Sequence, residues 1–466
     1  MVSRRAASSS LDQALIAASR EWPGRDTLAF TIVAPATPPA AGGVGILRLS
    51  GPGALAIART VAPAVPDSPS PNRVYFTDFV DAAGAVLDEG LFIYFRAPHS
   101  YTGEDVVELQ AHGSPRLLEM LQEQILRDPL ARVAEPGEFT RRAFLNGRID
   151  LARAEAVADL ISADSAAAVR AAARQLGGAL SDKIRQVREP LLALYADLEA
   201  LLNFPAEASD AGADFADRLS SAAAGTRALL AGAARGTLLR RGARVVLYGP
   251  VNAGKSTLFN CLLGESRALV DEEPGTTRDA LEGRLDISGL AVTLVDTAGL
   301  RASPGRLETL GIERTRAAAR SADLALLILP PGCCGREVEA WLQEAADTPV
   351  LRVGSKSDLG PTAERVEISV SGRTGAGLGQ LERAIAVRLW GEGAPQAVEL
   401  ASQRHADAVR RATDSLDRAR RALEESALEV VSGEVGLAVE ALGEITGENA
   451  PDELLDAIFR RFCIGK

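Results

Sequence analysis

A glycine-rich segment has the spacing of a loop that binds phosphate. Residues 249–256 have the sequence GPVNAGKS, which fits the pattern G-x-x-x-x-G-K-[ST]. An apolar run that we expect to be a strand precedes this segment and a predicted helix follows it. Its backbone N–H groups would therefore converge on phosphates at a helix N-terminus. We expect Lys255 to contact the β- and γ-phosphates, and the Ser256 hydroxyl to bind Mg²⁺.

Three further segments follow in the order that a guanine-nucleotide site requires. Residues 296–299 (DTAG) end an apolar strand; the carboxylate would hold the metal through water, and the glycine N–H would contact the γ-phosphate. Residues 355–358 (SKSD) stand in the position of [NT]-K-x-D, whose carboxylate accepts two hydrogen bonds from guanine. Adenine offers no such pair of donors. Residues 371–374 (SGRT) would lie behind the base. Together the four segments predict a P-loop GTPase.

Two positions depart from the usual pattern of such enzymes. Ser355 replaces the common Asn or Thr, so we expect weaker nucleotide binding, with guanine specificity retained through Asp358. Leu300 follows the DTAG segment, and its side chain cannot orient a water molecule as the Gln of Ras-like enzymes does. Glu308 is the candidate for that catalytic task. A carboxylate at a helix N-terminus is also common for purely structural reasons, and that alternative stays open.

A monovalent cation is a candidate for the positive charge that an arginine finger would otherwise supply. Asn252, inside the phosphate loop, could help to bind it. Residues 275–279 (GTTRD) are expected to form the first switch loop, with Thr277 closing on Mg²⁺.

The elements that must position these residues alternate between strand and helix. From Arg244 to about Trp390, apolar strands are separated by helical segments, which predicts a doubly wound, mostly parallel α/β sheet. The expected strands are 244–248, 292–296, 324–329, 349–355 and 366–370.

The segments on either side of this block have different patterns. Residues 26–146 contain candidate strands at 44–49, 91–95 and 106–111 and a candidate helix at 115–125, which indicates an α+β domain. Residues 147–241 and 392–466 have apolar positions at helical spacing, with interruptions expected at Gly177-Gly178 and Pro190. We expect these two segments to form one helical bundle, with the GTPase domain (242–391) inserted between them.

The composition excludes several classes of protein. The 466 residues, 47% of them hydrophobic, suffice for about three domains with sizeable cores. A net charge of −11 disfavours a protein that wraps nucleic acid over its whole surface. Four cysteines argue against a disulfide framework and fit a reducing compartment. No apolar run approaches the roughly 20 residues of a membrane span, so we expect no stable membrane insertion.

The first 25 residues form a separate case. They are rich in Ser, Arg and Ala, and Asp12 is their first acidic residue, which is a composition also found in organelle transit peptides. A disordered extension of a bacterial protein is the simpler interpretation. We therefore expect a cytoplasmic bacterial protein, with a mitochondrial location as the lesser alternative.

Longer motifs make the sequence resemble a known family. The segments GPVNAGKS, PGTTRD, DTAGLR and LETLGIERT, the N-terminal SYTGEDVVELQAHG and EPGEFTRRAFLNGRIDLARAEAVADLI, and the ending FCIGK resemble the tRNA modification GTPases called MnmE or TrmE. The resemblance extends from about Asp26 to Lys466.

This resemblance implies a second site and a set of partners. Members of the family dimerise through the N-terminal domain, which binds 5-formyl- or 5,10-methylene-tetrahydrofolate. With a flavoprotein partner (MnmG, or GidA) they form a heterotetramer that adds a carboxymethylaminomethyl-type group to C5 of the wobble uridine, U34, of certain tRNAs. The implied folate contacts are Arg48, Glu108, Arg148 and Lys466. Cys463 would take part in the modification, although a small buried thiol is the alternative.

The resemblance further implies GTP hydrolysis stimulated by K⁺, with two GTPase domains facing each other across the nucleotide. The acidic start of the loop at 271–276 departs from the family pattern and puts the affinity for K⁺ in doubt. Candidate K⁺ ligands are Asn252, Asp271, Glu273 and Thr276; candidate Mg²⁺ ligands are Ser256 and Thr277; and candidate catalytic residues are Glu308, Lys255 and Cys463. The full set of predicted nucleotide and cation contacts is Asn252, Ala253, Gly254, Lys255, Ser256, Thr257, Asp271, Glu272, Glu273, Pro274, Gly275, Thr276, Thr277, Asp296, Thr297, Ala298, Gly299, Ser355, Lys356, Ser357, Asp358, Ser371, Gly372 and Arg373.

Two other kinds of protein share the GTPase pattern. A ribosome-assembly GTPase would normally add a basic RNA-binding module, and no such module is evident in this acidic sequence. A nucleotide-dependent dimerisation switch without chemistry of its own would not need the folate-type N-terminus or the terminal cysteine.

Overall fold

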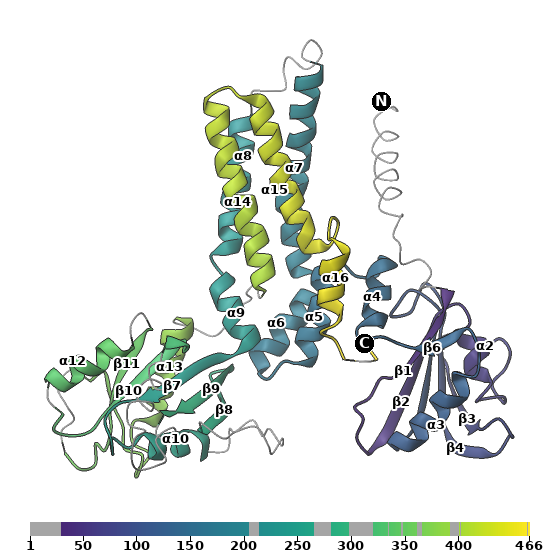
Figure 1. Cartoon of the computed structure of the whole chain (residues 1–466), viewed down its shortest axis with the longest axis horizontal. Helices are drawn as coiled ribbons and strands as arrows, with labels where there is room; N and C mark the ends of the chain where they lie inside the picture. Colours follow the sequence, from purple (N-terminus) through teal and green to yellow (C-terminus); the bar gives the residue numbers. More distant parts are fainter. Residues whose placement is uncertain are drawn as a thin grey trace, which may run out of the picture. The chain divides into compact units, whose positions relative to one another are not determined.

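The chain folds into two compact units. The structure, a computed structural model, describes residues 29–204, 214–264, 281–297, 320–333, 335–345, 348–360, 366–391, 400, 402–463 and 465–466. The N-terminal unit comprises the chain up to Ala154 together with Ala450–Lys466, and the central unit comprises Glu155–Asn449 (Figure 1). Glu308 and the loop at 271–277 lie outside the described residues.

The N-terminal unit is built on a six-stranded sheet of order β3-β4-β5-β2-β1-β6. Every neighbouring pair of strands is antiparallel except β1 and β6. Its elements are β1 (Thr31–Pro35), β2 (Gly42–Ser50), α2 (Ala54–Arg59), β3 (Val74–Val80), β4 (Val86–Phe95), β5 (Val106–Gly113), α3 (Pro115–Ile125), β6 (Ala131–Val133) and α4 (Glu138–Leu145).

Both faces of this sheet are covered at β1, whose side chains point alternately to two buried clusters. Val33, Leu47 and Leu109 belong to one buried cluster, whereas Ile32 and Phe139 belong to another. Since successive side chains of a strand point to opposite faces, β1 is covered on both sides. The sequence patterns had not predicted β1, β3 or β6.

The last residues of the chain belong to the N-terminal unit. Helix α16 (Asp452–Phe459) packs on α4, with Phe144 and Phe459 ring centroids 6.3 Å apart and an Arg141–Asp456 ion pair of 3.1 Å. The predicted boundary had placed 392–466 entirely with the helical bundle. The difference arises because aromatic residues of the tail find their apolar partners on α4, a contact that local spacing cannot reveal.

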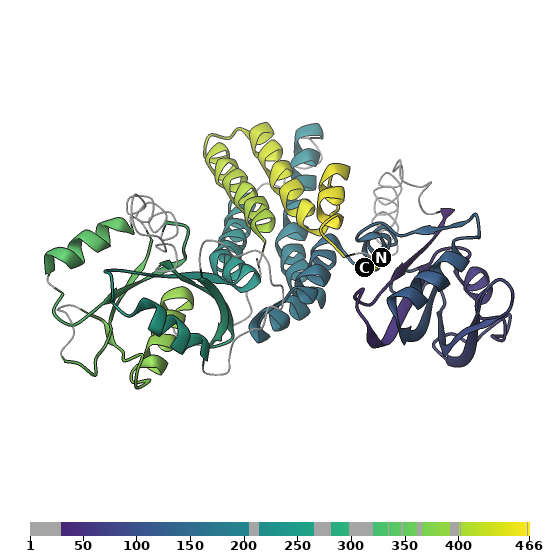
Figure 2. The same ribbon diagram turned by 60° about the horizontal axis from the view of Figure 1, so that its bottom comes forward.

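The central unit contains a helical bundle made from two separate chain segments. Helices α7, α8, α14 and α15 lie side by side in both views (Figures 1 and 2). The first segment supplies α5 (Leu151–Ile161, which starts in the N-terminal unit), α6 (Ala166–Leu176), α7 (Ala179–Asn203), α8 (Phe215–Leu230) and α9 (Ala233–Arg241), and the second supplies α14 (Gln403–Glu424) and α15 (Leu428–Thr446). None of the described helices is long and apolar enough to cross a membrane.

The interruption expected at Pro190 is wrong. Pro190 lies inside α7, which continues to Asn203. Proline removes one backbone hydrogen bond of the helix, and the burial of Leu191, Leu194 and Leu198 beyond it offsets that loss. The expected break at Gly177-Gly178 is confirmed, since Gly178 has φ +99° and precedes the first residue of α7.

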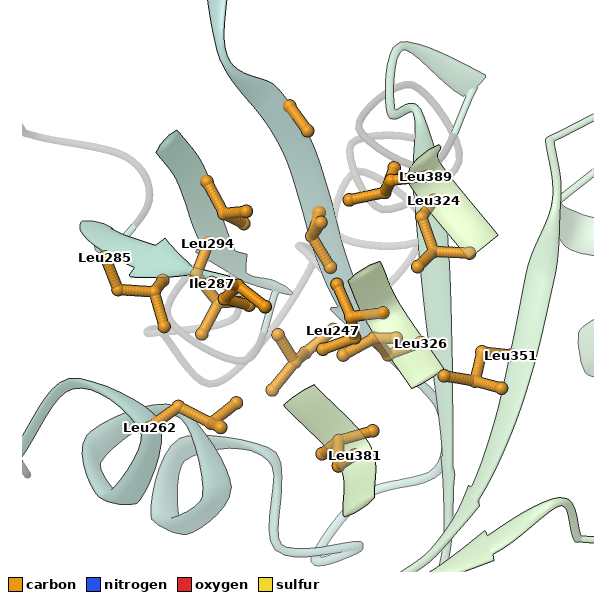
Figure 3. Packing of buried hydrophobic residues seen from close by; sticks show 14 of the residues in the cluster. Leu247, Leu262, Leu285, Ile287, Leu294, Leu324, Leu326, Leu351, Leu381 and Leu389 are labelled. Carbon is orange, nitrogen blue, oxygen red and sulfur yellow. The ribbon is translucent and has the colours of Figure 1, made fainter. Parts of the chain in front are cut away.

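The α/β domain has the expected mostly parallel sheet, in the order β12-β11-β10-β7-β9-β8. Among the described strands of this sheet, only β8, which forms a hairpin with β9, is antiparallel to its neighbour. The sequence patterns had not predicted β8. Leu247 and Leu326 lie in the same buried cluster as Leu262 and Leu381 (Figure 3). The elements are β7 (Ala243–Tyr248), α10 (Lys255–Gly264), β8 (Leu281–Ile287), β9 (Leu290–Asp296), β10 (Leu324–Leu329), α12 (Gly335–Glu344), β11 (Val350–Gly354), β12 (Ile368–Ser369) and α13 (Leu378–Trp390).

Candidate functional site

The glycine-rich segment forms a tight loop between β7 and α10. Gly249 has φ +135°, and a Cβ there would lie 2.5 Å from the carbonyl oxygen of Ile328, so this position requires glycine. The Nζ of Lys255 donates to the carbonyl oxygens of Gly249 (3.0 Å) and Pro250 (2.7 Å). Residues 251–257 and Lys356 line an open depression at this end of the sheet. The loop therefore has the curled shape that a phosphate-binding backbone needs.

Two of the predicted metal-binding residues are in direct contact. Because β9 pairs with β7 in parallel, Asp296 lies opposite Leu247, directly beside the phosphate loop. The Ser256 hydroxyl donates to Asp296 Oδ2 at 2.6 Å, and the Thr297 hydroxyl donates to the Leu247 carbonyl at 2.8 Å. Hydroxyl and carboxylate oxygens are ligands that suit Mg²⁺, so this pair fits the expected ion.

The predicted guanine-reading segment is tied to the phosphate loop. The Ser355 hydroxyl is buried and lies 2.6 Å from the Ala253 carbonyl oxygen and 3.2 Å from that of Leu329. Lys356 has φ +54° and donates from Nζ to the Asn252 carbonyl at 2.7 Å. The short Ser355 side chain thus retains a contact with the phosphate loop. The weaker nucleotide binding that we expected from it stays a prediction.

The carboxylate predicted to read guanine is exposed and oriented by a hydroxyl. Ser371 donates to Asp358 Oδ1 at 2.6 Å, and its oxygen accepts from the backbone N–H groups of Arg373 (3.3 Å) and Thr374 (3.2 Å). The hydrogen bond from Ser371 lowers the pKa of Asp358 below its usual range. The side chain is therefore an ionised acceptor near neutral pH, as the donors of guanine require.

The remaining predicted residues of this site fall into two groups. Within the described residues, Asn252 has φ +60° and an exposed side chain, Ser357 donates its N–H to Val370, Thr257 lies in the first turn of α10, and Gly372 accepts from the Cys261 thiol. Outside the described residues lie Asp271, Glu272, Glu273, Pro274, Gly275, Thr276, Thr277, Ala298, Gly299 and Glu308.

A second cluster of polar side chains lies in the N-terminal unit. Arg48 on β2 stands opposite Glu108 on β5, with 2.9 Å from Nε and 2.8 Å from Nη2 to the same carboxylate oxygen, Oε1. Arg48 Nη1 also donates to the Gly465 carbonyl at 3.4 Å. Lys466 is half-buried, and burial together with the charge of Arg48 lowers its pKa. Three of the four implied folate contacts therefore come together, whereas Arg148 is exposed in the turn after α4.

Two aromatic residues of this cluster were not singled out in the sequence. The Arg48 guanidinium lies 5.7 Å from the centre of the Tyr101 ring and 5.8 Å from that of Phe139. The Tyr101 hydroxyl lies 2.8 Å from the Thr140 hydroxyl on α4. No periodic pattern marks these residues, because they come from a loop and from a helix that is distant in sequence.

The C-terminal tail reaches this cluster through a tight backbone contact. Gly465 has φ +96°, and a Cβ at this position would overlap the Pro35 carbonyl oxygen. The Cys463 carbonyl oxygen accepts from the Gly137 N–H at 3.5 Å, while the Cys463 thiol is free and exposed. We call Arg48, Glu108, Tyr101, Phe139, Cys463, Gly465 and Lys466 the tail site. Its cations suit a carboxylate-bearing ligand, and Glu108 can accept from ring N–H groups.

Comparison with known proteins covers nearly the whole chain. Residues 31–148 match the family model described as GTP-binding protein TrmE N-terminus, and residues 151–463 match that of the MnmE helical domain. The tRNA modification GTPase MnmE of Myxococcus xanthus is 61% identical over 437 residues, which cover 94% of this chain and 99% of the relative.

A more distant relative and a solved structure extend the comparison. The tRNA modification GTPase MnmE of Alkalilimnicola ehrlichii is 45% identical over 94% of this chain and 99% of its own. Among solved structures, the G domain of the T. maritima FeoB iron transporter is 23% identical over 31% of this chain and 98% of its own, with a TM-score of 0.24. On the two family models and the relative of 61% identity, the chain belongs to the MnmE (TrmE) family of tRNA modification GTPases.

Proposed function

We propose that the chain binds and hydrolyses GTP and uses this activity in the modification of tRNA. The observation that carries the proposal is the meeting of four separate sequence segments at one end of the sheet. Ser256 contacts Asp296, Ser355 contacts the phosphate loop, and Ser371 contacts Asp358. The curated relatives named tRNA modification GTPase supply the second half of the proposal.

In the proposed reaction, the protein contributes position and charge. The phosphate-loop N–H groups and Lys255 would bind the β- and γ-phosphates. Ser256 would ligate Mg²⁺ and Asp296 would hold it through water, and the ion would neutralise charge on the phosphates. The Lys255 ammonium, now bonded to Gly249 and Pro250 carbonyls, would exchange those partners for phosphate oxygens. Asp358 selects guanine.

The finer features of hydrolysis are proposed from the sequence. Glu308 would position the attacking water, since Leu300 cannot. Asn252 and the loop at 271–276 would bind K⁺. This fits because K⁺ takes oxygen ligands and the Asn252 side chain, within the phosphate loop, is exposed. Thr277 would complete the Mg²⁺ site.

We further propose that the tail site binds a one-carbon tetrahydrofolate. Arg48 and Lys466 would bind the carboxylates of the folate tail, Glu108 would accept from its pterin ring, and Arg148 would add a further cation. The Cys463 thiol is free and exposed, and it would serve in the transfer reaction. The product would be a carboxymethylaminomethyl-type group at C5 of U34 in certain tRNAs. A flavoprotein partner of the MnmG (GidA) type would be required, and the N-terminal units would dimerise.

GTP hydrolysis by the full chain tests the first half of this proposal. We expect hydrolysis in K⁺ to exceed that in Na⁺ by at least about tenfold, and Glu308→Ala to remove most of it. Equal rates in both salts would rule out the cation-driven mechanism.

Binding of 5-formyl-tetrahydrofolate to the full chain tests the second half. A ribosome-assembly GTPase or a dimerisation switch would hydrolyse GTP without binding this folate. Absence of binding by a chain that still hydrolyses GTP would therefore eliminate the tRNA-modification proposal and retain the GTPase.

A further inference from the structure

A buried cluster of charges lies in the central unit, apart from the residues of both sites. Glu155 on α5 accepts from Arg404 Nε (3.0 Å) and Nη2 (3.1 Å). His405 is fully buried, and its Nε2 lies 2.5 Å from Glu155 Oε2. Burial by itself would raise the pKa of Glu155, but the charges of His405 and Arg404 and their hydrogen bonds outweigh it and lower the pKa to about 2. Glu155 is thus ionised near neutral pH although it lies within the helices.

Arg404 also forms hydrogen bonds with a third helix, α15. Arg404 Nη1 donates to the Glu444 carbonyl at 2.8 Å, and Nη2 lies 3.3 Å from the Ile445 carbonyl oxygen. Both carbonyls belong to the last turn of α15. Arg404 therefore joins α5, the first turn of α14 and the end of α15 at one point.

A second ion pair lies one helical turn further along α5. Asp159 is four residues beyond Glu155, on the same face of the helix, and its Oδ1 accepts from Arg240 Nε at 2.7 Å. Arg240 lies in the last turn of α9. Burial raises the pKa of Asp159 despite its arginine partner. The carboxylate is therefore largely withdrawn from water and depends on Arg240 for charge compensation.

These two carboxylates lie at the two places where the chain passes between the bundle and the GTPase domain. The outgoing chain ends α9 at Arg241 and begins β7 at Ala243, and Asp159 holds its last helical turn. The returning chain ends α13 at Trp390 and begins α14 at Gln403, and Glu155 holds its first helical turn. Helix α5 therefore forms ion pairs with both connections between the bundle and the GTPase domain.

The segment that follows α5 also contacts the hairpin of β8 and β9. Asp164 pairs with Arg284 on β8 at 3.5 Å, and Ala167 on α6 belongs to the same buried cluster as Leu290 of β9. Strand β9 ends at Asp296, which contacts Ser256 in the nucleotide site. A shift of β9 on nucleotide binding would therefore reach α6 and α5 through packed atoms.

We propose that α5 is the element through which nucleotide binding is transmitted to the helical bundle, with Glu155 and Asp159 as its positioning residues. This inference rests on the proposed GTP binding. It goes beyond that binding because it names the helix through which the nucleotide site is coupled to the bundle. The two ion pairs couple both connections to α5. Movement of the returning chain would leave the buried Glu155 without its partner, and movement of the outgoing chain would leave the partly buried Asp159 without Arg240.

Hydrogen exchange of the full chain, with and without a non-hydrolysable GTP analogue and Mg²⁺, tests the path. In the wild type we expect exchange in α5 and in the first turn of α14 to change by at least about fivefold on adding nucleotide. Asp159→Asn and Arg240→Gln should lose that response while GTP hydrolysis stays within about twofold of the wild type. The charge-swapped pair Asp159→Arg with Arg240→Asp should recover part of the response, which a merely damaged fold would not do.

A matched control removes an ion pair of the same bundle away from both connections. Arg218 and Asp197 form a 2.7 Å pair between α8 and α7, and Asp197→Asn should leave the exchange response unchanged. A wild-type response in Asp159→Asn and Arg240→Gln would overturn the proposal, as would a loss of response that always accompanies an equal loss of hydrolysis. If Asp159→Asn does not fold, Arg240→Gln decides, because its side chain is 35% exposed. A wild type that binds no GTP would instead refute the proposed function itself.

Discussion

The nucleotide site and the tail site are assembled from the sequence in different ways. Each part of the nucleotide site is a short contiguous segment at the end of a strand, and a few hydroxyl contacts such as Ser256 to Asp296 join the parts. The tail site instead brings together single residues from β2, β5, a loop, α4 and the chain terminus. Among them are Arg48 and Gly465, which are 417 residues apart. Local motifs predict the first kind of site. The family resemblance indicated charged members of the second, and only the folded chain shows that Tyr101 and Phe139 belong with them.

The largest expected effect is a loss of folate affinity in a variant that disturbs the C-terminal tail and leaves the nucleotide site unchanged. Gly465→Ala introduces a Cβ at φ +96° that overlaps the Pro35 carbonyl oxygen, so the tail must leave its position. We expect the affinity for 5-formyl-tetrahydrofolate to fall by about 100-fold, equivalent to about 3 kcal/mol, with GTP hydrolysis unchanged. Isothermal titration of the full chain measures the first quantity.

A glycine of the same conformation provides the control. Gly84 has φ +81°, and a Cβ added there would have no neighbouring atom within 4 Å. Gly84→Ala therefore has the backbone strain without the overlap and should bind folate normally. Equal losses in the two variants would show that the tail contact does not matter.

The pH dependence of stability also distinguishes the two regions. The carboxylate responsible, Glu155, lies in the central unit, which contains the nucleotide site, whereas the tail site lies in the N-terminal unit. The pKa of Glu155 is about 2 in the folded chain, against 4.5 for the ordinary side chain. Its contribution, about 3 kcal/mol, is therefore present above pH 4.5 and is lost as the pH falls towards 2. Urea unfolding followed by helical circular dichroism should show this loss.

The variant Glu155→Gln isolates that contribution. Its free energy of unfolding should be lower than that of the wild type at pH 7. This difference should vanish at low pH, where the Glu155 carboxyl of the wild type becomes protonated. A difference that stays constant from pH 7 to pH 3 would contradict the role of the ionised carboxylate.

A smaller effect is expected within the tail site. Arg48→Met removes a guanidinium that pairs with Glu108 and contacts the Gly465 carbonyl. Loss of a charge-assisted contact costs about 2 kcal/mol, so the affinity for folate should fall by roughly 30-fold. Arg116→Met, on α3 of the same unit, removes an exposed arginine with carboxylate partners of its own and should have no effect. If both variants bind alike, Arg48 is not a ligand.

The smallest expected effect lies in the nucleotide site. Ser355→Asn supplies a longer amide that can bond the Ala253 carbonyl, as the hydroxyl does now, and can add a second contact. We expect GTP affinity to rise by about fivefold, equivalent to about 1 kcal/mol. Ser357→Asn, in the same segment, is the control. An unchanged affinity would mean that the serine hydroxyl already suffices.

The parts of the fold that the sequence predicted are those whose cause is local. Apolar runs and adjoining motifs indicated β7, β9, β10 and the loop around Lys255. The edge strand β8 was missed, although Leu285 and Ile287 are buried and alternate with polar residues as in a strand with one covered face. The expected break at Pro190 failed because burial along α7 outweighs one lost hydrogen bond. Phe139 and Tyr101 were missed because their partner, Arg48, lies far away in the sequence.

The central claim is that this chain reads guanine through Asp358. In the wild type, GTP should be hydrolysed and ATP should not compete for binding even at a large excess. Asp358→Asn replaces an acceptor by a group that can donate, so GTP affinity should fall by at least about 100-fold while xanthosine triphosphate, which carries a carbonyl in place of the exocyclic amine, becomes the preferred ligand. Unchanged GTP binding by Asp358→Asn, or equal binding of ATP and GTP by the wild type, would contradict the account.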